Sequence, residues 1–402
     1  MNAGFLWALR DGAALDPLYD LESLSELDER LEAHLDALRL EGDAAWELCA
    51  ARLDDAEAGD VFVAAVLGVD RGDLPGIART LDLVGESPEL SWGVASALEW
   101  ASFDRVRGIL PGLLNSRCPP ELHYLGIAAC AGHRQDPGAS LGYALMSSDR
   151  RLKARALRAA GELGRADLLP ELRAGMGDED EACRFWASWS AALLGEPAAA
   201  RILRDFARGG GAHAERACDA AMRVMEPGVA SPWLHSLADA VGGARAALVG
   251  AGALGDPAAI PWILECMPSP EIARAAAAAF TTITGVSLAA EKLRGPAPEG
   301  FRAGPTDDPE DEIVAMDPDE SLSWPDAEAV KGWWGRRAGE FTQGTRYLLG
   351  KPISIGWLGQ VLRQGSQPAR AGAAMELRIR QQSRTLFDVR APGYRQGREL
   401  GI

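Results

Sequence analysis

The sequence predicts an all-α fold, a right-handed α-solenoid of about eight or nine stacked helix pairs with an acidic insertion. Three observations predict it. Aromatic residues, which favour strands, make up only 6% of the chain, whereas alanine, the strongest helix former, is abundant throughout. Helix-ending positions recur about every 30 residues. The chain has 402 residues, too many for one compact core, so an extended array fits its length.

The repeat is most regular in the middle of the chain. Ala-rich helices are predicted to end at five positions separated by 31, 30, 30 and 30 residues: Gly164, Gly195, Met225, Gly255 and Gly285. The same phase continues upstream, more weakly, at Gly132, Ala101 and Asp70. After Gly255, Asp256 is placed to cap the next helix. We therefore predict helix-pair repeats over residues 59–290.

The segments outside the repeats have their own composition. Residues 1–58 are predicted to form a helical cap, because leucines recur on one helix face: Leu24, Leu27, Leu31, Leu35 and Leu38. Residues 291–330 read as an exposed acidic Pro/Gly-rich insertion, with ten carboxylates and no base between Ala303 and Val330. Residues 331–402 are predicted to hold a final helix pair and an irregular basic tail.

Charge divides the chain sharply. Residues 1–330 hold 28 basic and 54 acidic residues, a net of −26, whereas residues 331–402 hold 13 basic and four acidic residues, a net of +9. A body this acidic is unsuited to nucleic acid, whose binding requires neutralisation of phosphates. No apolar run reaches the length of a membrane span, so we expect no membrane contact. Six cysteines without a CxxC pair favour a reducing, cytoplasmic location.

Catalytic motifs are missing from the sequence. His213 and Glu215 are the closest approach to metal-ligand spacing, and one such pair cannot build a site. Cys130 and His133 lie one helical turn apart, but their apolar surroundings favour core packing over a catalytic dyad. Residues 209–211 are three glycines without the Lys-Ser/Thr of a phosphate loop. We expect no metal, no cofactor and no enzymatic activity.

Two further residue sets recur in the repeats. Five arginines recur at nearly the spacing of the repeats: Arg155, Arg184, Arg216, Arg245 and Arg274. We favour the interpretation that each pairs with a carboxylate or a helix end over the alternative that they form a cationic binding stripe. Tryptophans in the repeats are predicted to lie in the core: Trp92, Trp100, Trp186, Trp189, Trp233 and Trp262.

The repeated pattern of two short helices joined by a tight turn resembles HEAT-like repeats in a short form of about 30 residues. Longer stretches resemble a proteobacterial family of HEAT-like proteins encoded beside type VI secretion components: LWALRDGAA, LDERLEAHLDALRLEGDAAWELC, GDVFVAAVLGVD, GTRYLLGKPISIGWLGQVLRQGSQPARAGAAMELRIR and LFDVRAPGYRQ. Some members of that family look like immunity proteins against spike-tip toxins, nucleases among them. The resemblance thus implies a non-enzymatic protein that neutralises a secreted toxin.

The acidic body fits this implication, because the cleft of a nuclease is basic and would attract it. The expected partner is a cognate toxin with a basic surface, a nuclease domain above all. Two groups of carboxylates are the predicted contacts: Asp307, Asp308, Glu310, Asp311 and Glu312 of the insertion, and Asp54, Asp55, Glu57 and Asp60 of the N-terminal region. The alternatives are an effector-loading adaptor or chaperone for type VI secretion, and a general protein-interaction scaffold.

Overall fold

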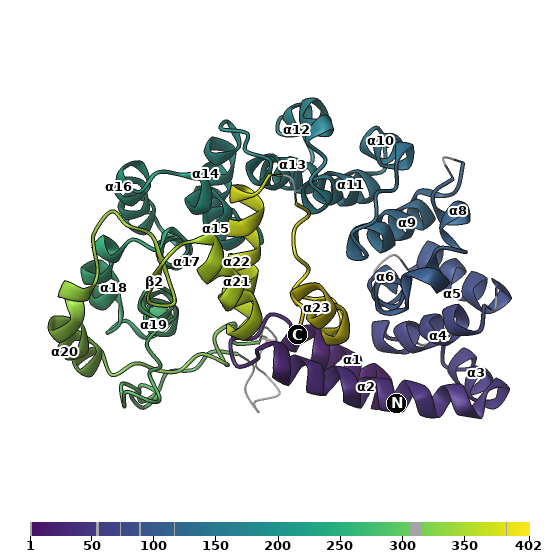
Figure 1. The fold of residues 1–402 in the computed structure, drawn as a ribbon, viewed down its shortest axis with the longest axis horizontal. Coiled ribbons are helices and arrows are strands. Elements are labelled where there is room, and N and C mark those ends of the chain that lie inside the picture. The colour runs from purple at the N-terminus through teal and green to yellow at the C-terminus, as the bar shows by residue number, and fades with distance from the viewer. Residues whose placement is uncertain are drawn as a thin grey trace. The chain divides into compact units, whose positions relative to one another are not determined.

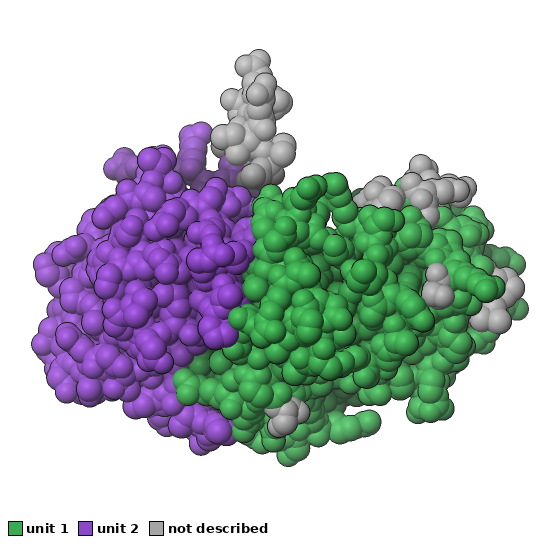
Figure 2. Space-filling view, turned by 90° about the horizontal axis from the view of Figure 1, so that it is seen from above, with its two compact units in different colours: residues 1–196, 362–402 green, residues 197–361 purple. Residues whose placement is uncertain are grey.

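The computed structural model describes residues 2–53, 56–72, 74–87, 90–115, 117–304, 316–382 and 384–402 (Figure 1). Within these ranges the regular structure is almost entirely helical; the strands are β1 (Tyr347–Leu348) and β2 (Lys351–Pro352), which form one small antiparallel sheet. The all-α prediction is therefore confirmed. The fold divides into two compact units, which Figure 2 colours separately: unit 1 is Met1–Glu196 with Leu362–Ile402, and unit 2 is Pro197–Val361. None of the helices in the described ranges is long and apolar enough to cross a membrane.

Unit 1 is a row of helices that pack in chain order, each against the next (Figure 1). The row consists of α4 (Ala58–Arg71), α6 (Ser91–Trp100), α9 (Pro120–Gly132), α11 (Arg150–Leu163) and α13 (Glu181–Leu193). A second set of helices packs beside this row: α5 (Leu74–Glu86), α7 (Phe103–Val106), α8 (Leu110–Leu113), α10 (Ala139–Leu145) and α12 (Leu169–Gly175). Stacking of pairs buries the apolar face that one pair alone would leave in water.

The N-terminal cap of unit 1 is a helical hairpin. Its members are α1 (Asn2–Ala13), α2 (Leu21–Glu41) and the short α3 (Asp43–Ala50). Asp20 and Ser23 form a capping box that fixes the start of α2. Four leucines of the predicted stripe are buried: Leu24, Leu27, Leu31 and Leu35. The fifth, Leu38, is partly buried and packs against the core that contains Leu31 and Leu35.

Unit 2 repeats the same arrangement. Here α15 (Ala214–Val224), α17 (Ala244–Leu254) and α19 (Pro270–Thr284) pack in chain order. The accompanying helices are α14 (Ala199–Gly209), α16 (Pro227–Ala238), α18 (Ile260–Cys266) and α20 (Ala327–Arg337). The chain then returns to unit 1 through α21 (Ile355–Gln364) and ends in α22 (Gln367–Arg380) and α23 (Gly393–Leu400).

Helix boundaries confirm the repeat phase. Gly164, Gly255 and Gly285 follow α11, α17 and α19 with φ of 72°, 72° and 70°, the left-handed conformation that lets glycine end a helix. Met225 is the C-terminal cap of α15. The side chain of Asp256 accepts a hydrogen bond from the backbone of Ala258, as its predicted capping role requires.

Small residues let neighbouring helices approach closely. A Cβ on Gly250 of α17 would lie 2.4 Å from the sulfur of Cys218 on α15. A Cβ on Gly161 of α11 would lie 2.5 Å from the hydroxyl of Ser190 on α13. The Ala/Gly-rich composition of these helices is therefore a packing requirement, since a larger side chain has no room at such contacts.

The C-terminal residues pack along the ends of the repeat helices. In unit 2, the backbone N–H groups of Tyr347 and Leu349 donate to the carbonyls of Gly255 and Thr282 at 2.8 and 2.7 Å. In unit 1, the N–H of Leu386 donates to the carbonyl of Glu162 at 2.8 Å. The tail was predicted to be irregular, and this is wrong for residues 393–400, which form α23 and pack against α2. The contact with α2 stabilises this helix, and the sequence of the tail alone does not show that contact.

Candidate interaction surface

The structure describes only two of the nine predicted contact residues, Glu57 and Asp60. The five insertion carboxylates, Asp307, Asp308, Glu310, Asp311 and Glu312, lie outside the described residues, as do Asp54 and Asp55. Of the remaining two, Glu57 is exposed where α4 begins. Asp60 is half-buried, with its carboxylate 3.4 Å from the guanidinium of Arg52. Among the predicted N-terminal carboxylates that the structure describes, Glu57 is thus the more accessible.

The predicted exposed acidic insertion is wrong at two described positions, Asp317 and Asp319, whereas Glu320, Asp326 and Glu328 are exposed. The carboxylate of Asp319 is buried and accepts hydrogen bonds from both terminal nitrogens of Arg245, at 2.6 and 2.8 Å. Asp317 accepts a hydrogen bond from Arg274 at 2.9 Å. These two carboxylates are neutralised within unit 2, so they are not available to a basic partner.

The two ends of the insertion are joined to each other. The N–H of Gly295 donates to the carbonyl of Trp324, and the N–H of Asp326 donates to the carbonyl of Leu293. The guanidinium of Arg274 lies 4.5 Å from the ring centre of Trp324, a cation–π contact. An arginine of the predicted ladder therefore holds the insertion against α19.

Arg155 and Arg184 of the arginine ladder also contact groups of their own repeats, whereas Arg216 is exposed. Arg155 donates to the buried carboxylate of Glu162 at 2.9 Å, and Arg184 donates to the carbonyl of Asp178 at 2.6 Å. Burial alone would raise the pKa of Glu162, but the charges of Arg155, Arg158 and Arg134 prevail and lower it to about 2. Arg155 and Arg184 thus follow the structural interpretation, because their guanidinium groups are engaged within the repeats.

Many of the C-terminal cations are also engaged internally. Arg346 donates to three carbonyls at helix ends, those of Arg223, Ala253 and Leu254. Arg395 donates to the carbonyls of Gly132 and Glu99. Cations are favourable at these positions because helix C-termini carry partial negative charge. Much of the positive charge of residues 331–402 is therefore used within the fold.

The N-terminal cap has the opposite character. We define the N-terminal acidic surface as five exposed glutamates of the α2–α3 segment: Glu22, Glu26, Glu29, Glu41 and Glu47. None of them makes an ion pair or side-chain hydrogen bond within the described chain. Glu22, Glu26 and Glu29 follow helical spacing, so they share one face of α2, where Arg30 is a neighbouring exposed base. The spacing of these three glutamates is visible in the sequence next to the leucine stripe. The predicted contacts were instead the carboxylates of the insertion and of residues 54–60.

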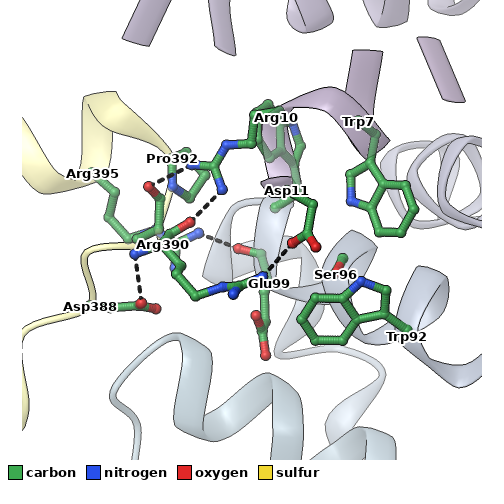
Figure 3. Close-up of a pocket in the computed structure, with 12 residues that line it drawn as sticks. Trp7, Arg10, Asp11, Trp92, Ser96, Glu99, Asp388, Arg390, Pro392 and Arg395 are labelled. Carbon is green, nitrogen blue, oxygen red and sulfur yellow. Dashed lines mark hydrogen bonds and ion pairs between the residues drawn. The ribbon is translucent and has the colours of Figure 1, made fainter. Parts of the chain in front are cut away.

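A small pocket of unit 1 joins three segments (Figure 3). Side chains of α1, α6 and the residues before α23 converge there, and the cavity of about 30 Å³ has room for about two water molecules. Arg10 spans it, donating to Asp28 and to the carbonyls of Arg390 and Ala391. The pocket is thus a junction filled by the protein's own groups.

Two side chains that line the pocket have unusual properties: Trp92 is more exposed than predicted, and Glu99 has a raised pKa. Trp92 is 37% exposed, so its predicted place in the core is wrong; the guanidinium of Arg390 covers part of its ring. Burial raises the pKa of Glu99 to about 7, against the opposing charge of Arg155 and with the help of Asp388. Glu99 makes no side-chain hydrogen bond in the described residues, which is why burial prevails.

Cys130 and His133 follow the core interpretation. Burial raises the pKa of the Cys130 thiol to about 11, the opposite of what a nucleophile needs. Burial also lowers the pKa of His133 to about 4, helped by the charge of Arg395, and its Nε2 lies 2.8 Å from the carbonyl of Leu98. Within the described ranges, no three His, Cys, Asp or Glu side chains come together as metal ligands.

Comparison with known protein families found one match. Residues 139–223, which span α10 to α15, match the model of HEAT repeats. Searches of curated proteins and of solved structures gave no match. Stacked repeats of this kind create extended surfaces that can bind other proteins. Residues 139–223 are therefore similar to HEAT repeats, and the helix pairs that stack on either side of this segment continue the same kind of packing.

Proposed function

We propose that this protein is a non-enzymatic inhibitor, an immunity protein that neutralises a type VI secreted toxin, with a DNA-cleaving toxin as the favoured class. The observation that carries the proposal is the N-terminal acidic surface, whose carboxylates have no internal cation. By contrast, the buried acids Asp28, Glu162 and Asp319 all have an arginine partner. Unpaired surface charge of one sign attracts a partner of the other sign.

The binding mode follows from this charge. A nuclease holds phosphates with a basic cleft, and a row of glutamates on a rigid helix can occupy that cleft in their place. Because α2 is already ordered, binding does not require the backbone entropy that ordering a loop costs, about 1–2 kcal/mol per residue. We therefore place the first contact on α2 and retain the insertion carboxylates, Asp307 to Glu312, as a second contact.

Neutralisation of a purified toxin tests this function and separates it from the adaptor alternative. The DNA-cleaving toxin domain that this proposal requires beside the gene is titrated with the full-length protein, and its cleavage of DNA is followed. We expect activity to disappear at one equivalent, and co-expression to restore growth. Binding without loss of activity would indicate an adaptor, and absence of binding would leave only a scaffold for other proteins.

A matched pair of variants locates the contact. The triple variant Glu22→Gln, Glu26→Gln, Glu29→Gln removes three unpaired charges from α2. The control, Glu179→Gln, Glu265→Gln, Glu271→Gln, removes three exposed charges from the repeats. We expect the first variant to need at least about tenfold more protein for the same inhibition, and the control to match the wild type.

A further inference from the structure

The outer face of α1 is unusual for the end of a repeat array. Terminal helices of such arrays normally present polar outer faces, because nothing stacks on them. The exposed residues of α1 carry no charge: Asn2, Phe5, Ala8, Leu9 and Gly12. Phe5 is 69% exposed and Leu9 is 40% exposed. A helix that obeyed only the needs of solubility would place charges at these positions.

The turn that follows α1 extends this apolar surface. Leu15 and Leu18 are 58% and 68% exposed. Fifteen large apolar side chains are exposed in the described chain, and six of them lie in the first 50 residues: Phe5, Leu9, Leu15, Leu18, Leu40 and Leu48. Leu40 and Leu48 lie at or beyond the far end of α2, so only Phe5, Leu9, Leu15 and Leu18 belong to α1 and the turn after it. Exposed apolar side chains grouped in this way are typical of a protein-binding surface.

Acidic residues adjoin the apolar ones. Leu18 precedes Glu22 by four residues, so their Cα atoms lie at most about 14 Å apart. The capping box at Asp20 and Ser23 holds this junction in one conformation. An apolar centre with a charged margin is the usual composition of a protein interface.

We infer that the outer face of α1 and its following turn bind an amphipathic, basic helix of a partner protein. Apolar side chains of that helix cover Phe5 and Leu9, and its Lys or Arg residues meet the glutamates of α2. The inference rests on the proposed function and specifies its contact: the acidic surface attracts the partner, and the apolar face of α1 retains it.

Two other binding partners of the α1 face, a second copy of the chain and a membrane, fit its negatively charged surroundings poorly. In a second copy of this chain, the same glutamates would lie near one another across a symmetric interface, which is repulsive. A membrane surface carries anionic lipids, whereas residues 1–60 have 16 acidic and four basic residues, a net of −12. A basic protein segment satisfies both the apolar face and the charge.

A defined peptide tests the surface without knowledge of the partner. The probe is an 18-residue peptide of leucine and lysine in amphipathic order, labelled for fluorescence anisotropy, and a scrambled peptide of equal composition is its control. We expect the full-length protein to bind the amphipathic peptide at least about tenfold more tightly than the scrambled one. Equal affinity for both peptides would overturn the inference, because charge alone would then explain binding.

Variants assign the binding to α1. Phe5→Ser with Leu9→Ser should weaken binding of the amphipathic peptide by about 10- to 100-fold, as expected for apolar anchors. Tyr143→Ser with Met146→Ser removes two other exposed apolar side chains and should change it less than about twofold. Unchanged affinity in the α1 variant would overturn the inference, as would a wild-type dimer in sedimentation that this variant abolishes.

The toxin assay separates this inference from the proposed function. If the wild type neutralises the toxin and the Phe5/Leu9 variant does so equally well, the α1 site is wrong and the immunity function stands. If the wild type does not neutralise the toxin, the function fails, and with it the claim that α1 retains a toxin, whatever the peptide shows.

Discussion

Asp319 accepts two hydrogen bonds from Arg245, at 2.6 and 2.8 Å, although 74 positions separate the two residues in the sequence. Arg245 also donates to Glu215 of the preceding repeat at 2.7 Å. One arginine thus links two repeats to the insertion. Charge that looks excessive in the sequence is balanced here by the repeat arginines.

Replacement of Asp319 by Asn should release the insertion from α17 and α19. We expect unit 2 to lose about 2 kcal/mol of unfolding free energy, because Arg245 keeps its charge and loses its buried partner. Urea denaturation followed by tryptophan emission measures this. Glu320→Gln is the matched control, since Glu320 is exposed, and it should stay within about 0.5 kcal/mol of the wild type. Equal stability of both variants would show that the ion pair contributes nothing.

Gly255→Ala should disturb the segment that carries β1. Gly255 and Gly242 have similar φ, 72° and 73°, so alanine strains the backbone at both by about 1 kcal/mol. At Gly255 the added Cβ would also lie 2.2 Å from the carbonyl oxygen of Tyr347, whereas Gly242 has no atom within 4 Å. We expect Gly255→Ala to cost at least twice as much as Gly242→Ala in thermal unfolding. Similar costs would mean that the contact with Tyr347 is unimportant.

Glu162→Gln tests the buried pair in unit 1. The variant should lose about 3 kcal/mol at pH 7, because Arg155 is left buried without its counter-charge. The pKa of Glu162 falls from 4.5 to about 2 in the folded protein, so its stabilisation is present above pH 4.5 and is lost as the pH falls towards 2. Urea midpoints between pH 3 and pH 7 should therefore converge for wild type and variant at low pH. Parallel pH profiles would contradict the assignment.

Glu99→Gln should act in the opposite direction. Burial raises the pKa of Glu99 from 4.5 to about 7, so the folded protein holds a proton that the unfolded chain releases. This carboxyl therefore destabilises the fold as the pH rises through that interval. We expect the variant to be more stable than the wild type by about 1–2 kcal/mol at pH 8 and equal to it near pH 4. A variant that is less stable at pH 8 would show that the ionised carboxylate has a partner there.

The parts of the fold that were predictable are those that local chemistry decides. Glycines at Gly164, Gly255 and Gly285 end helices through their own backbone freedom, so the repeat phase was visible without any contact. The structural role of the arginines followed from their fixed phase. In both cases the residue and its effect lie within one repeat or its neighbour.

What the sequence could not provide depends on contacts between distant residues. Asp319 looks like any acid of a Pro/Gly-rich loop until Arg245 is placed beside it. The tail forms α23 because α2 supplies a surface, and Trp92 is exposed because α6 turns it away from the core. The acidic row of α2 was visible as Glu22, Glu26 and Glu29, but accessibility and lack of partners are properties of the folded chain.

The central claim is that unpaired glutamates of α2 attract a basic toxin. Stopped-flow association of the purified toxin domain with the protein, at low and at physiological salt, tests it most directly. We predict an association rate that falls steeply with salt, since the screening length shrinks to about 8 Å at physiological strength. The Glu22/Glu26/Glu29→Gln variant should associate several-fold more slowly, and the Glu179/Glu265/Glu271→Gln control should match the wild type. A rate independent of salt, or equal rates for the two variants, would contradict the account.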